Sequence, residues 1–184
     1  MPTILTHPAP ILALGAALGF RRLSPRLLWL AVFCAILPDF DVIGFRLGMH
    51  YADLFGHRGF SHSLLFALLC GGLAGLSAPW LRCRRWLAFI VIFAAVASHI
   101  ALDAATNGGL GVAAFYPVSD ARYFFPWRPI QVSPLALSAF FSERGFSVLR
   151  SEFLWVWLPC LSFGLVAFVL RRWGNPSAVV SKAA

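Results

Sequence analysis

Long stretches of apolar residues alternate with short polar segments along the whole chain. The apolar runs are Pro8–Phe20, Leu27–Leu37, Ser63–Leu81, Ala88–Ala105 and Phe153–Leu170. A helix of about 20 apolar residues is long enough to cross a lipid bilayer. The pattern therefore predicts an all-α protein, a polytopic membrane bundle of four or five transmembrane or partly spanning helices.

The first two runs are shorter than a full membrane span. They suit helices that are short, tilted or re-entrant, which are tolerated where other helices bury their backbone. Whether or not they span the membrane, the two helices form a hairpin. His7 precedes the first helix and Asp39 follows the second, so both residues lie on the same side of the membrane.

The composition fits a membrane protein. Of the 184 residues, 60% are hydrophobic and 12% are charged, whereas soluble domains carry about 25% charged residues. The four cysteines are widely spaced and form no CxxC pair, so we expect them to be packing residues rather than metal ligands or disulfides.

The charged residues are sorted between the two ends of the predicted helices. Basic residues without acidic neighbours fill the segments 21–26, 82–85 and 171–184, and all seven acidic residues fall toward the opposite end. Positive loops mark the cytoplasmic side. We therefore expect a multi-pass protein of a bacterial inner (plasma) membrane with a cytoplasmic C-terminus. The net charge of +8 then reflects topology, and no nucleic-acid partner is expected.

The chain is predicted to form one membrane domain. Residues 1–174 make up this domain, including an outer loop at 106–150, and residues 175–184 form a flexible cytoplasmic tail. The outer loop is rich in aromatic residues and suits an interfacial aromatic layer, a lid, or a loop packed by its own side chains. A short amphipathic helix is expected at Leu135–Leu149.

Two ionisable residues lie within the fourth apolar run. His99 and Asp103 are four positions apart and share one face of a helix. Polar groups at membrane depth are costly and usually have a partner or a function. We interpret the pair as metal ligands; the alternative is a hydrogen-bonded pair that satisfies a polar spot between helices.

Other candidate ligands converge on the same membrane level, the end that we expect to face outward. They are His7, Asp39, Asp41, His57 and His62. Histidine and carboxylate ligands suit a divalent metal, with zinc expected and manganese or iron as alternatives. An open coordination position in such a site can bind and activate water.

The sequence allows more than one role for each of these residues. Asp39, Asp41 or both are expected to bind the metal, and a carboxylate that does not bind it could accept a proton. His62 is the stronger ligand, and His57 could be a ligand, a residue behind the ligands or a general acid. Arg58 suits a phosphate or carboxylate oxygen, or, alternatively, lipid head groups or a pair with Asp41 or Asp53. His50 and Asp53 are expected to face solvent.

Three motifs carry a family resemblance. They are Leu37-Pro38-Asp39-Phe40-Asp41, His57-Arg58-Gly59-Phe60-Ser61-His62-Ser63, and Ser98-His99-Ile100-Ala101-Leu102-Asp103 with Thr106-Asn107-Gly108-Gly109. In this order they resemble the motifs of the YdjM-like membrane proteins, a family described as predicted membrane-bound metal-dependent hydrolases. The segment Tyr116 to Tyr123 resembles the part of that family that follows the metal helix.

The resemblance extends distantly to the all-helical zinc-dependent phospholipases C and single-strand nucleases. It implies a first metal site at Asp39 or Asp41 with His62, His99 and Asp103, and a role for His7 at a second ion through the shared aspartate. This sequence has no histidine after His99 and so lacks the later His-x-x-x-Glu pair of those enzymes. One ion or an asymmetric pair is therefore expected rather than a cluster of three.

The resulting hypothesis is a membrane-bound hydrolase that uses metal-activated water on a phosphoester of a lipid or lipid-linked substrate. Asp41, His57 and Arg58 are the candidate catalytic residues, with Arg122 as a further candidate for a phosphoryl oxygen. The alternatives are a scaffold with a structural metal and a cation transporter. The transporter is less favoured because all acidic residues lie toward one end. The oligomeric state stays open.

Overall fold

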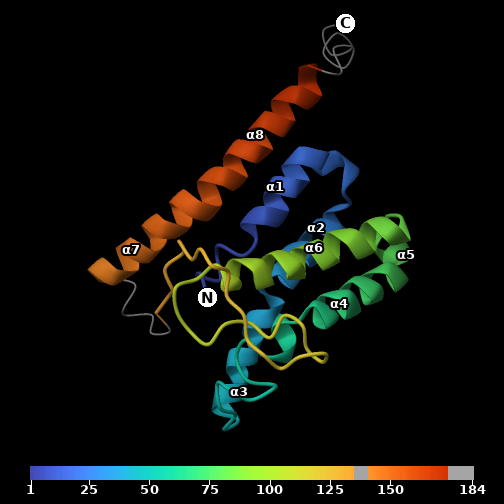
Figure 1. Ribbon diagram of the computed structural model, residues 1–184. Coiled ribbons are helices and arrows are strands. Elements are labelled where there is room, and N and C mark those ends of the chain that lie inside the picture. The colour runs from blue at the N-terminus through green and yellow to red at the C-terminus, as the bar shows by residue number, and fades with distance from the viewer. Residues whose placement is uncertain (135–140, 174–184) are drawn as a thin grey trace, which may run out of the picture.

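The computed structural model describes residues 1–134 and 141–173, and the regular secondary structure there is helical apart from two isolated β-bridges. This agrees with the predicted all-α bundle (Figure 1). The helices are α1 (Ala9–Leu18), α2 (Pro25–Ile36), α3 (Ile43–Arg46), α4 (Leu64–Leu76), α5 (Ala78–Leu81), α6 (Arg85–Ala104), α7 (Glu143–Glu152) and α8 (Leu158–Trp173). Three short 3₁₀ turns, η1 (Phe20–Arg22), η2 (Leu37–Val42) and η3 (Phe60–His62), link helices, and a π-helical turn, η5 (Phe153–Trp157), joins α7 to α8.

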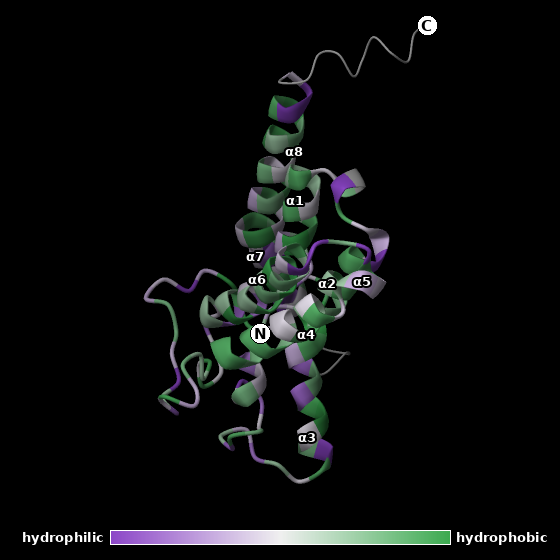
Figure 2. Cartoon of the chain, turned by 90° about the vertical axis from the view of Figure 1, so that its right-hand side faces the viewer, coloured by the Kyte–Doolittle hydropathy of each residue, from purple (hydrophilic) through white to green (hydrophobic). Residues whose placement is uncertain are grey.

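Three helical stretches are long and apolar enough to cross a membrane, namely Pro25–Arg46, Arg85–Ala104 and Glu143–Trp173. Helices α1 and α4 are apolar but shorter. Figure 2 shows that the helices are mostly hydrophobic and that the polar residues concentrate in the connections and at helix ends. The described part of the chain is thus a membrane helical bundle with full-length and shorter helices together.

The second apolar run is longer as a helix than its sequence suggests. We expected it to stop at Pro38, but the chain continues as the 3₁₀ turn η2 and then as α3, as far as Arg46. Proline is tolerated at the start of a helical turn because its missing N–H has no partner there. Pro38 occupies that place in η2.

The last run also starts earlier than expected. Its helix begins at Glu143 and continues through α7 and η5 into α8, so the short helix expected at Leu135–Leu149 is instead the first part of this long helix. Positions 135–140 of that expectation, and the tail expected at 175–184, lie outside the described residues.

Helix α6 is the centre of the bundle, and it packs against both α2 and α4. Small residues bring α4 and α6 close together: a Cβ atom built on Gly71 would lie 3.1 Å from the backbone oxygen of Phe89. Close approach at small residues is the usual means of packing membrane helices. Helix α1 packs mainly against α8, where Gly164 faces Ala13 and Ala16.

The basic connections lie at one end of the bundle. Arg171 of α8 donates 2.9 Å hydrogen bonds to the backbone oxygens of Ala16 and Ala17, at the end of α1. Arg26 of α2 donates to the backbone oxygen of Trp80 in α5 at 2.8 Å. The N-terminus and α3 lie toward the opposite end (Figure 1). The sorted loops of the sequence therefore correspond to two ends of one bundle.

Candidate metal centre

Five buried polar side chains meet at the end of the bundle opposite the basic connections. His7 precedes α1, Asp39 lies in η2, His62 ends η3, and His99 and Asp103 lie on α6. None of the five is more than 2% exposed. We call these five residues the metal-site cluster. It unites four segments of the chain, all of which the sequence predicted to reach this level.

Four members of the cluster form a compact group of potential ligands. One ligand atom from each of Asp39, His62, His99 and Asp103 lies within 4.8 Å of the others. His62 Nε2 is 3.1 Å from Asp103 Oδ2, and His99 Nε2 is 3.6 Å from Asp39 Oδ1. Two imidazoles and two carboxylates form a donor set that suits zinc or another divalent ion.

His7 approaches the same two carboxylates through their other oxygens. Its Nε2 lies 3.5 Å from Asp39 Oδ2 and 3.9 Å from Asp103 Oδ1. Its ring stacks on that of His99, with the ring centroids 3.8 Å apart. Each carboxylate therefore presents one oxygen to His62 and His99 and the other oxygen to His7.

Several polar atoms of the cluster have no hydrogen-bond partner among residues 1–134 and 141–173. They are both ring nitrogens of His7 and all four carboxylate oxygens of Asp39 and Asp103. Buried carboxylates without hydrogen bonds carry a desolvation penalty of several kcal/mol, and a bound cation would remove it. The residues present therefore fit a divalent metal.

Hydrogen bonds behind the cluster orient two of its histidines. His99 Nδ1 lies 2.7 Å from the backbone oxygen of Ala35, and His62 Nδ1 lies 3.2 Å from Asp41 Oδ2. A partner of this kind on one ring nitrogen leaves the other nitrogen free to bind a metal. In both residues that other nitrogen is Nε2, which faces the cluster.

Asp41 lies on the far side of His62. Its Oδ1 is 2.6 Å from His57 Nδ1, and its Oδ2 accepts hydrogen bonds from Ser61 Oγ at 2.7 Å and from the backbone N–H of Arg58 at 3.1 Å. Asp41, His57 and His62 form a second group whose ligand atoms lie within 4.8 Å of one another. Both aspartates of the Asp-x-Asp motif therefore contact histidines, but from different sides of His62.

Arg58 is completely buried behind Asp103. Its Nε lies 3.2 Å from Asp103 Oδ2, and its terminal nitrogens donate to the backbone oxygen of Gly108 and to Thr106 Oγ1, each at 2.9 Å. The alternatives of lipid head groups, or of a pair with the Asp41 or Asp53 carboxylate, were wrong. Arg58 has a left-handed backbone with a φ of +64°. The His57 side chain contacts Asp41, whereas the Arg58 side chain contacts Asp103.

The histidines outside the membrane-spanning helices have altered pKa values. Burial lowers the pKa of His7 to about 3. Burial also opposes charge on His62, but the adjacent carboxylates of Asp103 and Asp41 outweigh it and raise the pKa to about 9. Burial lowers the pKa of His57, and its hydrogen bond to Asp41 only partly offsets this. His62 is therefore the ring whose cationic form the two carboxylates favour.

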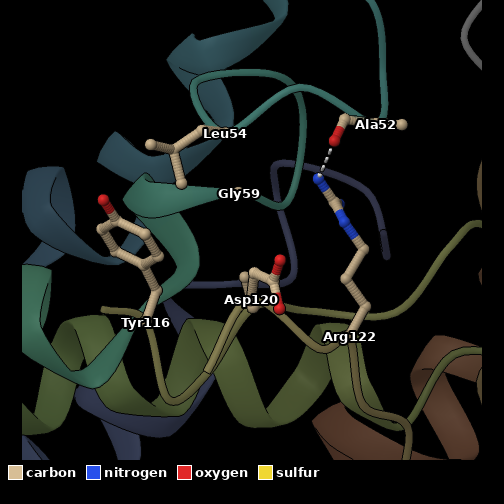
Figure 3. Close-up of a pocket in the computed structure, with 7 residues that line it drawn as sticks. Ala52, Leu54, Gly59, Tyr116, Asp120 and Arg122 are labelled. Carbon is tan, nitrogen blue, oxygen red and sulfur yellow. Dashed lines mark hydrogen bonds between the residues drawn. The ribbon is translucent and has the colours of Figure 1, made fainter. Parts of the chain in front are cut away.

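Arg122 lies away from the cluster and holds the loop before Arg58. It donates hydrogen bonds to the backbone oxygens of His57, Tyr51, Ala52 and Asp53, at distances of 3.0 to 3.3 Å. Beside it is a cavity of about 320 Å³ (Figure 3). The cavity is lined by Ala52, Leu54, Gly59, Ala113, Tyr116, Asp120 and Arg122.

Two further predictions concern residues near the cluster. His50 and Asp53 were expected to face solvent, and their side chains are 89% and 51% exposed.

Glu152 was not singled out, yet its carboxylate is buried and accepts hydrogen bonds from the backbone N–H and hydroxyl of Thr3 and from the hydroxyl of Thr6. Thr6 directly precedes His7. A lone acid at the start of an apolar run was the signal that could have identified Glu152.

Comparisons with known proteins agree with the arrangement of motifs. The family described as YdjM inner membrane protein matches residues 1–174. The inner membrane protein YbcI of Escherichia coli (strain K12) is 43% identical over 163 residues, covering 86% of this chain and 92% of that protein. No solved structure matches. With its helical bundle and its candidate spans, this chain belongs to the YdjM family of inner membrane proteins.

Proposed function

We propose that the protein is a membrane-bound, divalent-metal-dependent hydrolase that acts on a phosphoester of a lipid or lipid-linked substrate. The observation that carries the proposal is the pair of buried carboxylates, Asp39 and Asp103, which have no hydrogen-bond partner within the described part of the chain and face three histidines. Polar groups of this kind are rarely kept at membrane depth without a function.

The cluster offers ligands for two ions. His62 and His99, with Asp39 Oδ1 and Asp103 Oδ2, would hold the first ion. His7, with Asp39 Oδ2 and Asp103 Oδ1, would contribute to the second. The two sites are asymmetric because the described residues supply two histidines to one and a single histidine to the other. Zinc is the ion best suited to these ligands.

A bound divalent ion would supply Lewis acidity and lower the pKa of water toward ~7. The protein's own groups would then manage protons and orientation. Asp41 orients His57 and His62 at the same time, since its two oxygens contact one ring each. Because burial keeps His57 neutral near pH 7, its free ring nitrogen is suited to accept a proton.

Arg58 is suited to position a ligand rather than to contact a phosphoryl group. Its guanidinium is fully buried and is directed at Asp103, Thr106 and Gly108. It would limit the excess negative charge of Asp103 and fix the direction of its carboxylate. Arg122 binds loop carbonyls and would preserve the shape of the loop.

The metal requirement can be tested on detergent-purified protein. We expect bound zinc, or another divalent ion, in the parent protein and its loss in Asp39→Asn and Asp103→Asn. Asp53→Asn is the matched control because that carboxylate is exposed. A parent protein that binds no divalent ion after equilibration with zinc, manganese or iron would rule out the proposal.

Turnover is tested separately with phosphomonoesters, phosphodiesters and phospholipids in mixed micelles. We expect hydrolysis that disappears on chelation and returns with the metal. A specific observation also favours a second candidate, a scaffold with a structural metal: all five cluster side chains are at most 2% exposed. Stable metal binding without turnover on any of these substrates would support the scaffold and reject the hydrolase.

A further inference from the structure

An apolar cavity of about 570 Å³ lies on the flank of α6, apart from the metal-site cluster. Its lining includes Pro10 of α1, Ser98, Ala101 and Leu102 of α6, Trp127 of the loop after α6, and Trp155 of η5. Its volume lies in the range typical of pockets for small molecules, roughly 300–1,000 Å³.

Among the described residues, the wall of this cavity offers no charged side chain and little hydrogen-bonding capacity. The one side-chain hydroxyl in it belongs to Ser98, and that hydroxyl already donates to the backbone oxygen of Ala95 at 2.8 Å. A polar ligand would lose its hydration there without gaining partners. The occupant must therefore be almost entirely hydrocarbon.

The elements around the cavity indicate that a hydrocarbon occupant would come from the membrane. Two walls of the cavity come from Arg85–Ala104 and Glu143–Trp173, both long and apolar enough to cross the membrane. Trp127 and Trp155 pack edge to face at its rim, with ring centroids 4.8 Å apart, and they remain 64% and 47% exposed. Exposed tryptophans are typical of the boundary between lipid chains and head groups.

The cavity and the metal-site cluster share their supporting elements. Leu102 is the direct neighbour of Asp103 on α6, and Pro10 lies in the first turn of the helix that follows His7. A chain held in this cavity would keep the rest of its molecule at the end of the bundle that carries the cluster.

From these observations we propose that the cavity binds one hydrocarbon chain of a membrane lipid and so holds a lipid substrate by its tail. The second half of this statement rests on the proposed hydrolase function, whereas the binding itself does not. The chain would displace little water and gain apolar contact on several sides, whereas a chain in the bilayer exchanges freely with its neighbours.

The test uses full-length protein in vesicles of phosphatidylethanolamine and phosphatidylglycerol that contain a trace of phospholipid with a diazirine near the end of one acyl chain. After illumination, peptide mass spectrometry locates the adducts. We expect adducts to concentrate at least fivefold on peptides that contain Leu102, Trp127 and Trp155, compared with peptides from the exposed face of α8. Even labelling along all lipid-facing helices would overturn the proposal.

Filling the cavity provides the matched comparison. Ala101→Phe should reduce labelling of these peptides at least fivefold, whereas Ile90→Phe should leave it unchanged, because Ile90 is an exposed residue of the same helix outside the cavity. Unchanged labelling in Ala101→Phe would contradict the inference. Should that variant fail to fold, competition on the parent protein decides: unlabelled long-chain lysolipid must suppress the adducts, and short-chain lysolipid must not.

The same preparations separate this inference from the hydrolase proposal. Labelling is measured with and without chelator, because chain binding does not need a metal. Concentrated labelling with no turnover rejects the hydrolase and retains the lipid site. Turnover that is equal on water-soluble and long-chain substrates, and unaffected by Ala101→Phe, rejects the role of the cavity in substrate binding.

Discussion

Glu152 offers a direct test of how the N-terminal segment delivers His7 to the metal-site cluster. Its buried carboxylate accepts the backbone N–H of Thr3 at 2.5 Å and the hydroxyls of Thr3 and Thr6 at 2.7 Å each. Trp157 of the same long helix also donates to Thr6 Oγ1, at 3.1 Å. The segment before His7 is therefore fixed to the start of the last helix.

The magnitude of the effect of Glu152→Ala follows from these contacts. The two threonine hydroxyls lie 3.2 Å apart, so one can donate to the other, and the Thr3 N–H and the second hydroxyl are left without their acceptor. An unpaired buried donor costs ~1–3 kcal/mol, and a hydrogen bond to a charged group contributes ~1.5–3 kcal/mol. Together these favour release of the segment by about 3 kcal/mol, which corresponds to roughly a 100-fold change in an equilibrium constant.

The assay is metal content after dialysis against a series of buffered free zinc concentrations. We expect Glu152→Ala to weaken binding of the ion assigned to His7 by tenfold or more, while the ion assigned to His62 and His99 is retained. Glu143→Ala is the control, since Glu143 lies on the same helix and is exposed. Equal loss of both ions, or two ions bound as tightly as in the parent protein, would refute this reasoning.

Three further predictions concern stability. Removing resident metal with a chelator should lower the melting temperature, because a ligand at 100 times its dissociation constant stabilises by about 2.7 kcal/mol; an unchanged melting curve would show that the purified protein holds no stabilising ion. Gly71→Leu should lower the free energy of unfolding by ~1–3 kcal/mol, measured by heat or denaturant, because a Cβ there meets the backbone of Phe89. Gly72→Leu should be tolerated because nothing lies within 4 Å of a Cβ at that position. Equal effects of the two substitutions would contradict the close α4–α6 contact. Arg58→Met should cost ~3–5 kcal/mol in metal-free protein because it breaks the buried ion pair between the guanidinium and Asp103. The exposed Arg46→Met should cost little. A neutral Arg58→Met would show that Asp103 does not need the guanidinium.

The helices could be predicted because their apolar runs are long and interrupted by charge. Their ends were less legible. Pro38 looked like a stop, yet it lies in the 3₁₀ turn η2, which starts at Leu37, and the chain continues helically to Arg46. At the other end of the chain, Glu143–Glu152 is polar enough to suggest a separate amphipathic helix, but a π-helical turn joins it to α8 without a break. Local sequence does not distinguish a helix that stops from one that changes its winding.

The convergence of the candidate ligands could be predicted because each of them lies near the same end of a predicted helix. Polar groups at one end of a membrane bundle have few places to meet. Placement of Asp39, His62, His99 and Asp103 at one end of a bundle needed only the directions of the helices. The contacts that each side chain makes could not be predicted in this way, because they depend on side-chain positions. The two aspartates of the Asp-x-Asp motif face different sides of His62, and that difference depends on the 3₁₀ winding of η2.

Arg58 shows a different limit of sequence reasoning. Its place between two histidines suggested a substrate contact, but its left-handed backbone sends the guanidinium into the protein toward Asp103. The same turn brings Gly109 so close that a Cβ there would lie 2.8 Å from an Arg58 nitrogen. A contact between segments this far apart in sequence leaves no periodic signal, so only the fold reveals it.

The metal-site cluster also connects two parts of the bundle. Helix α1 packs mainly on α8, whereas α6 packs on both α2 and α4. His7 belongs to the first part, and Asp39, His62, His99 and Asp103 belong to the second. Because both aspartates face His7 and the other two histidines at once, ions bound there would join the parts through shared ligands. Metal binding is then linked to assembly of the bundle, and a change at Glu152 bears on it through the position of His7.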